Sequence, residues 1–151
     1  MIEASQMREH VERVIEENKI TYRPVERIQQ SRCSPWRAGE RPVVQFVPVW
    51  SALTYAVALH ELGHALGRHV NHVDDIVRER DAWDWARANA IAWTPKMERL
   101  AAMCMRRANK KWDAWMKVLN AMHERADRAI NFGCKLHRRL KPTGTGATPR
   151  G

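Results

Sequence analysis

The pattern of hydrophobic and polar positions predicts three helices in the first 95 residues. In residues 3–18, apolar side chains recur at helical spacing between Glu and Arg, and they are Met7, Val11, Val14 and Ile15. Residues 52–69 contain no proline and are rich in Ala and Leu, so the helix expected there is apolar nearly all round and should be central. Ser51 precedes it at a position that favours capping. A third apolar stripe predicts a helix over residues 75–93.

Between the first two helices the composition is typical of short strands. Residues 43–49 are mostly β-branched or aromatic and include Pro48, which is the composition of a buried or edge strand. Its partner should come from residues 19–30, which form either a strand interrupted by Pro24 or a strand followed by a short helix. Residues 31–42 collect Ser, Pro, Gly and Arg, so we expect a loop or hairpin there.

The last third of the chain predicts a long helix, because no Gly or Pro occurs between Pro95 and Gly133. Apolar residues in this stretch step by three or four positions, as a single amphipathic helix or two in series would require; they are Met97, Leu100, Cys104, Ala108, Trp112, Trp115, Leu119, Met122, Ala126 and Ile130. Such length favours pairing with the rest of the domain or with another subunit. We therefore expect a core over residues 1–95, a helical extension over 96–140 and a disordered Gly-, Pro- and Thr-rich tail over 141–151.

The formal charge of +9 is concentrated in the extension and tail. Residues 1–95 hold 12 Lys and Arg against 13 Asp and Glu, a net charge of −1, whereas residues 96–151 hold 14 against 4, a net charge of +10. Such asymmetry favours an acidic partner. A basic helical face can follow phosphates without reading base sequence, so nucleic-acid contact is a secondary hypothesis beside a simply solvated surface.

Composition and cysteine usage limit the classes of protein to which this chain can belong. A length of 151 residues, 44% hydrophobic and 28% charged, is typical of one soluble globular domain. The uncharged residues 42–59 are interrupted by proline and glutamine, unlike a membrane span, and the first 30 residues lack the apolar region of a secretory signal. No C-x-x-C pair occurs, so we expect reduced thiols at Cys33, Cys104 and Cys134. We expect a cytoplasmic protein without a membrane partner.

The strongest chemical signal is His60-Glu61-Leu62-Gly63-His64, an H-E-x-x-H inside the predicted central helix. On a helix His60 and His64 lie one turn apart on one face, so both imidazoles can bind one Zn²⁺, with Glu61 beside them as a candidate general base. Burying these three polar side chains among Ala, Leu, Val and Gly is costly unless something satisfies them. A metal ion would do so; the alternative is a pair of core histidines satisfied without metal.

A zinc site of this kind needs a third protein ligand, and a catalytic one also needs an open position. A histidine six residues after His64 would complete one pattern, but that position is Val70. Glu79 on the next predicted helix is the preferred ligand, because Ala82, three residues later, is small enough to let the two helices approach closely. Asp81, which points to a different face, is the alternative, and either carboxylate could instead be a solvated helix residue.

The segments V-A-L-H-E-L-G-H-A-L-G at 57–67 and E-R-D-A-W-D-W-A at 79–86 resemble gluzincin-type zinc metallopeptidases, most closely the small ImmA/IrrE-type proteins encoded by phages and mobile elements. The resemblance covers about residues 20–95. It implies a small sheet beside the motif helix and assigns the zinc ligands and general base to His60, His64, Glu79 and Glu61. The family often has Asp or Asn directly after the E-x-x-A alanine, as a partner for a ligand histidine, where this chain has Trp83.

These observations predict an α+β, mainly helical fold, in which a small antiparallel sheet lies beside the H-E-x-x-H helix and a basic helical extension follows. On this hypothesis the protein is a zinc metalloendopeptidase acting on an intracellular protein, and the resemblance suggests a regulator or repressor as substrate. Candidate donors for the oxyanion of the transition state are Tyr55, His69 and His72. The alternative is a basic protein that binds nucleic acid or a partner and keeps a structural or vestigial zinc site.

Overall fold

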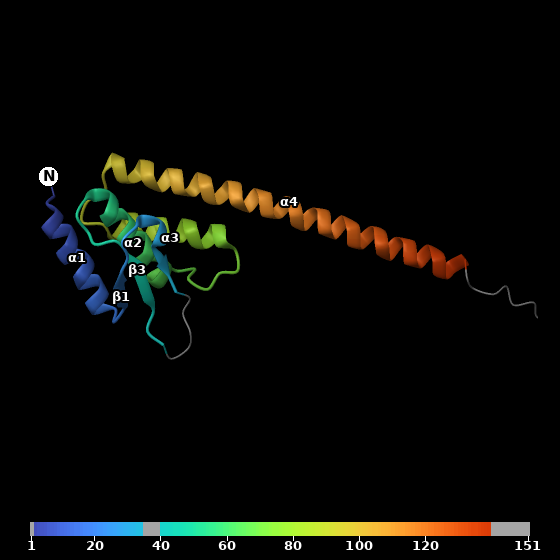
Figure 1. Ribbon diagram of the computed structural model, residues 1–151, viewed down its shortest axis with the longest axis horizontal. Coiled ribbons are helices and arrows are strands. Elements are labelled where there is room, and N and C mark those ends of the chain that lie inside the picture. The colour runs from blue at the N-terminus through green and yellow to red at the C-terminus, as the bar shows by residue number, and fades with distance from the viewer. Residues whose placement is uncertain (1, 35–39, 140–151) are drawn as a thin grey trace, which may run out of the picture. The chain divides into compact units, whose positions relative to one another are not determined.

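The computed structural model describes residues 2–34 and 40–139, and the chain divides into two compact units at residues 1–112 and 113–151. Figure 1 shows the order of the elements. They are α1 (Ala4–Glu17), β1 (Thr21–Pro24), the 3₁₀ turn η1 (Ile28–Gln30), β2 (Arg32–Cys33), β3 (Val43–Phe46), α2 (Ala52–Leu66), α3 (Asp75–Asn89) and α4 (Pro95–Arg139). The mainly helical α+β fold is confirmed, and each predicted helix is present, although α2 and α3 end at Leu66 and Asn89, before the predicted ends at residues 69 and 93.

The sheet is mixed, which corrects the expectation of a purely antiparallel one. Its strand order is β1-β3-β2, and β3 pairs antiparallel with β2 but parallel with β1, where Thr21 lies opposite Val43. The chain passes from β1 through η1 and β2 before β3 enters between the two strands. Tyr22 of β1 stacks on Phe46 of β3 with ring centroids 4.4 Å apart, and its hydroxyl donates to the Phe46 carbonyl at 3.1 Å. Side-chain alternation specifies the faces of a strand but not its direction, so the sequence pattern left this point open.

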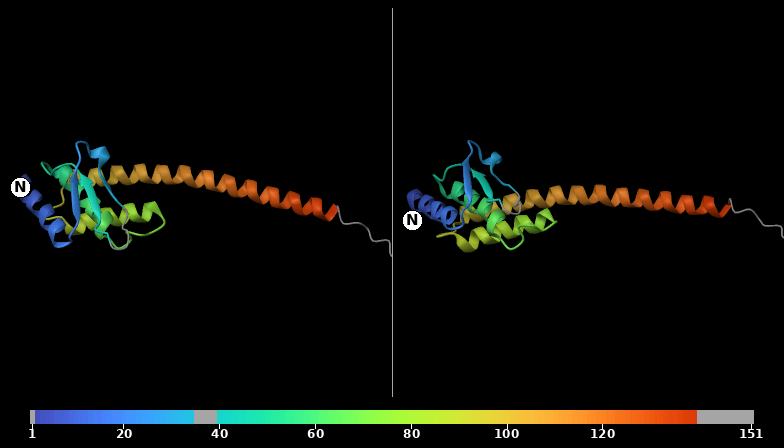
Figure 2. Two further views of the ribbon diagram at one scale, coloured as in Figure 1. Left: turned by 60° about the horizontal axis from the view of Figure 1, so that its bottom comes forward. Right: turned by 90° about the horizontal axis from the view of Figure 1, so that it is seen from below.

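Helix α2 forms the centre of the first unit, as its apolar composition predicts. The Ser51 hydroxyl accepts from the Thr54 backbone N–H at 3.3 Å, and the Thr54 hydroxyl accepts from the Ser51 N–H at 3.0 Å, so the predicted cap is present as a reciprocal pair. Figure 2 shows α2 between the sheet and α3, and α1 also packs on it. Leu59 and Leu62 are fully buried in the core.

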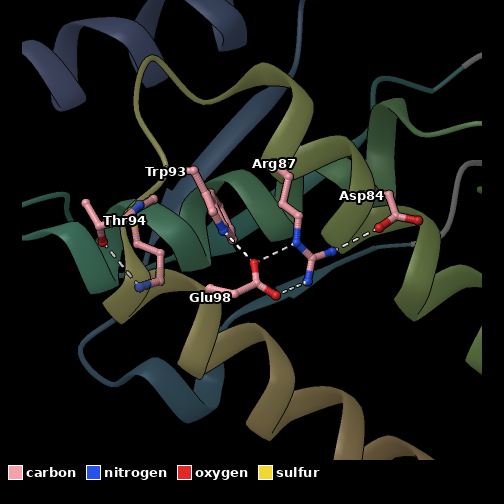
Figure 3. Close-up of polar contacts among 6 residues, drawn as sticks. Asp84, Arg87, Trp93, Thr94 and Glu98 are labelled. Atoms are coloured by element: carbon pink, nitrogen blue, oxygen red, sulfur yellow. Dashed lines mark hydrogen bonds and ion pairs between the residues drawn. The ribbon is translucent and has the colours of Figure 1, made fainter.

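A polar corner joins α3 to α4 (Figure 3). Arg87 of α3 donates two hydrogen bonds of 2.9 Å to the carboxylate of Glu98 on α4, and the Trp93 indole N–H donates to the same carboxylate at 2.7 Å. At the start of α4, Met97 and Ala101 are fully buried. The first unit therefore extends to residue 112, beyond the predicted core boundary at 95, because the start of α4 packs into the core.

The second unit contains the remainder of α4, and its helical structure agrees with the long helix predicted after Pro95. The predicted tail over residues 141–151 lies outside the described residues. Among the residues that the structure describes, no helix is both long and apolar enough to cross a membrane.

Candidate metal centre

The candidate centre forms at the seam where α2 and α3 touch. His60, Glu61 and His64 lie on α2, and Glu79 lies on α3. A side chain at Gly63 would be impossible without a shift, because its Cβ would lie 2.8 Å from the Ala82 Cα. Gly63 and Ala82 thus allow backbone contact between the helices, and this contact brings Glu79 opposite the two histidines.

The three predicted ligands converge. The Nε2 atoms of His60 and His64 are 3.1 Å apart, and each lies 3.3 Å from a different carboxylate oxygen of Glu79. Their ligand atoms all lie within 4.8 Å of one another, so the group could hold a metal ion. Two imidazoles and a carboxylate directed at one small volume are a donor set suited to a divalent cation.

The surroundings of these groups move their pKa values in different directions. Burial lowers the pKa of His60, although the hydrogen bond to Glu79 opposes the change. Burial also acts to lower the pKa of His64, but the contact with Glu79 outweighs it and the pKa rises. Burial acts to raise the pKa of Glu79, and the hydrogen bonds from both histidines outweigh it and hold the pKa well below its usual range. Glu79 is therefore ionised at neutral pH, as a ligand carboxylate must be.

Glu61 follows His60 on α2 and is buried, with 6% of its surface exposed. Burial raises the pKa of its carboxyl to about 7, where the charge of Glu79 adds to the rise and that of His64 opposes it. It is not one of the three converging ligands. The structure thus places an ionisable carboxyl next to the cluster but outside it.

Trp83 holds His60 from the side facing α3. The indole and imidazole rings stack with centroids 4.1 Å apart and an interplanar angle of 21°. His60 Nδ1 is buried without a hydrogen-bond partner, and so is the Trp83 indole nitrogen. At the position where the family resemblance implies an Asp or Asn as a partner for a histidine, this chain therefore has a tryptophan that stacks on His60. The sequence analysis identifies Trp83 as a departure from the family pattern but does not predict that its ring stacks on His60. The signal that could have predicted this stack is the i,i+4 spacing of Trp83 from Glu79, which places both side chains on one face of α3.

Asp81 does not join the cluster, so the alternative third ligand is not brought to the site. Its carboxylate accepts from the His69 backbone N–H at 2.9 Å and lies 3.3 Å from His69 Nδ1. It contacts the turn that follows α2, close to Gly67. A structural role in closing this turn accounts for its position.

The three candidate oxyanion donors also have other contacts. The Tyr55 hydroxyl is fully buried, 2.8 Å from His10 Nδ1, and accepts from the Ile91 N–H at 3.1 Å. His69 pairs with Asp81, and His72 Nδ1 accepts from the Asp74 N–H at 3.0 Å. None of the three is among the residues that converge on the cluster.

Cys33 and Cys104 are free thiols. Burial, with the nearby charge of Glu61, raises the pKa of Cys33 to about 11. Burial is also the main cause of a raised pKa at Cys104, which is likewise free. Both are therefore protonated at neutral pH, in agreement with the expected reduced state, and the side chain of Cys134 lies outside the described residues.

Comparisons with known proteins give no match. No family model matches the chain, and no curated protein or solved structure matches it. The identity of the donors, their spacing and their burial are the observations that bear on the chemistry of this candidate centre.

Proposed function

We propose that this chain is a zinc metalloendopeptidase that hydrolyses peptide bonds in an intracellular protein. The observation that carries the proposal is the convergence of His60, His64 and Glu79 within 4.8 Å, with the buried carboxyl of Glu61 next to them. Two histidines and a glutamate are the ligand set of one class of catalytic zinc sites, in which a fourth position stays open. Three protein donors in this arrangement fit that class.

Each residue has a defined part in the reaction. Zinc, when bound, supplies Lewis acidity that makes water nucleophilic near neutral pH and polarises the scissile carbonyl. Glu61 accepts the proton of the attacking water and delivers it to the leaving amine nitrogen as the C–N bond breaks. Trp83 keeps the His60 ring in place on the buried side. The resemblance of the motif segments to ImmA/IrrE-type proteins supports a regulator or repressor as substrate.

Metal content tests the ligand set. Elemental mass spectrometry should find about one zinc per purified chain in the wild type, and none in His64→Ala or Glu79→Gln. Asp81→Asn is the matched control, because it makes the same carboxylate-to-amide change two residues away on α3, where the side chain contacts the turn instead. It should keep its zinc. A wild type that takes up no zinc when supplied with it would refute the proposal.

A second experiment separates an enzyme from a structural zinc site. Glu61→Gln should keep its zinc, because Glu61 is not one of the converging ligands, but should lose the hydrolysis of a quenched-fluorescent peptide library by at least about 100-fold. Equal hydrolysis by the variant and the wild type would remove Glu61 from the mechanism. Zinc-loaded wild type without hydrolysis would favour a structural or vestigial site.

The basic face of α4 supports nucleic-acid binding as a second candidate function. Arg99, Arg106 and Lys110 are spaced by seven and four residues, so they share one helix face, and Arg107 and Lys111 extend it. All five are exposed, and none forms an ion pair within the part of the chain that the structure describes. Five unpaired cations in 13 residues make a site for phosphates.

Duplex DNA binding measured by fluorescence anisotropy tests this second function. Affinity should fall steeply with added salt, and Arg106→Gln combined with Lys110→Gln should weaken binding by about 10-fold and reduce the salt dependence. Glu61→Gln should bind DNA like the wild type. Binding that is independent of salt or of both basic residues would count against the basic face.

A further inference from the structure

The apolar face of α4 continues beyond the core of the first unit. Met97 and Ala101, at the start of this face, are fully buried. After Trp112 the same helix has large apolar side chains in contact with water: Trp115 is 54% exposed, Val118 51% and Met122 60%. Exposed Trp and Met at helical spacing on one face mark an interaction surface rather than scattered surface residues.

The second unit contains no other described element that could cover this face. It begins at Asp113, and α4 is the element that the structure describes in it. Most of the stability of a helix in water comes from packing of its amphipathic face, since nucleation is costly and intrinsic propensity is weak. Within the described part of the second unit, the apolar face of α4 can therefore be buried only by a partner.

The spacing of the apolar face fits a partner helix. Half-buried Trp112 and Leu119 alternate with exposed Trp115 and Met122 at intervals of three, four and three residues. This is the alternation of the apolar seam in helices that pack side by side over several turns. Val118 flanks the seam and widens it.

Charge favours a second copy of this chain over a polyanion at this face. Residues 96–112 hold six Lys and Arg against one acidic residue, whereas residues 113–134 hold three against three, which are Lys117, Arg125 and Arg128, and Asp113, Glu124 and Asp127. The exposed apolar face thus coincides with the neutral part of an otherwise basic helix. Two copies would meet here without net repulsion, while a nucleic acid or an anionic membrane would gain little.

We propose that residues 112–122 form a self-association surface through which two copies of this chain pack their α4 helices together. A two-fold arrangement is self-complementary, so the same four side chains serve both partners. Lys117 is exposed and lies on the opposite side of the helix, and it stays in water in the assembly. The proposal is independent of the metal centre.

Sedimentation equilibrium of the full chain tests the proposal. The wild type should sediment at twice its 17.6 kDa mass. Trp115→Lys with Met122→Lys should sediment as a monomer, or need at least about 10-fold more protein to associate. Ala114→Lys with Ala121→Lys is the matched control: it adds the same two charges to exposed positions of the same helix but outside the seam, and it should associate like the wild type.

Folding and alternative partners are controlled in the same series. The double variant Trp115→Ala with Met122→Ala keeps high helix propensity and should also weaken association. It tests the proposal even if the lysine variant loses its helical structure. A wild type that stays monomeric at every concentration, or equal association of the seam and control variants, would overturn it. So would a monomeric wild type that binds vesicles of phosphatidylserine and phosphatidylcholine, because the face would then have a lipid partner.

Discussion

The two helices that carry the candidate metal ligands are buried to very different degrees. α2 is enclosed along most of its length and brings His60, Glu61 and His64, whereas α3 buries mainly Ala82, Trp83 and Ala86. Glu79 therefore comes from a helix that is partly open to solvent. The position of Glu79 relative to the two histidines of the buried α2 therefore depends on a few close contacts of α3, which are those of Ala82 with Gly63 and of Trp83 with His60.

Loss of the Trp83 stack should have the largest effect on this arrangement. Trp83→Ala removes a side chain that is 2% exposed and should lower the free energy of unfolding by about 3–5 kcal/mol. Trp85→Ala, two residues away and only half-buried, should cost much less, and Trp83→Phe should keep the stack and the zinc. Urea unfolding measures all three. Equal losses of unfolding free energy at positions 83 and 85 would show that the stack on His60 does not contribute to stability.

A methyl group added at Gly63, where α2 touches α3, should be the next most damaging change. Gly63→Ala raises helix propensity by about 1 kcal/mol, but the new Cβ would overlap the Ala82 backbone, which cannot rotate away as a side chain could. We expect a net loss of about 2 kcal/mol and weaker metal binding, because separating the helices moves Glu79 from the histidines. Calorimetry checks the first effect and zinc titration the second. An unchanged melting temperature would mean that α3 shifts freely along α2.

The polar contacts that Tyr55 of α2 makes away from the α2–α3 contact should contribute less to the free energy of unfolding. Tyr55→Phe removes the hydroxyl that contacts His10 and accepts from Ile91 N–H, and should cost about 1–2 kcal/mol because these buried groups lose their partner. Tyr22→Phe is the matched control, since its hydroxyl contacts the Phe46 carbonyl at a half-buried position. Chemical denaturation should show the larger loss for Tyr55. The reverse order would mean that this end of α2 is not rigidly held.

The ion pair between Arg87 of α3 and Glu98 of α4 should have the smallest effect on stability, and this effect should depend on pH. The hydrogen bonds from Arg87, then Trp93, lower the pKa of Glu98 to about 2. Because the folded-state pKa lies below the unfolded value of about 4.5, the contribution is present above pH 4.5 and is lost as pH falls towards 2. Glu98 is half-exposed, so we expect under about 1 kcal/mol. Wild type and Glu98→Gln should differ in stability at pH 6 and converge near pH 2; a constant difference would exclude this ion pair as the cause.

Sequence periodicity predicted much of the fold and the identity of the converging residues. The helices follow from apolar positions repeating every three or four residues, and the i,i+4 spacing of His60 and His64 fixes their common face through local helix geometry. Ala82 follows Glu79 at a spacing that permits close helix contact, which favours Glu79 over Asp81 as the third ligand. These are local relations along one element or between neighbouring ones, so the chain alone contains them.

Tertiary structure decided what depends on residues distant in the chain. The direction of β1 relative to β3, the stack of Trp83 on His60, the contact of Asp81 with His69 and the burial of Met97 all arise from packing between separate elements. A helical or strand period specifies which face of an element is apolar, but not which neighbour covers that face or at what angle. The amino-acid sequence therefore determined the elements and the donors of this protein, and long-range packing alone determined how they meet.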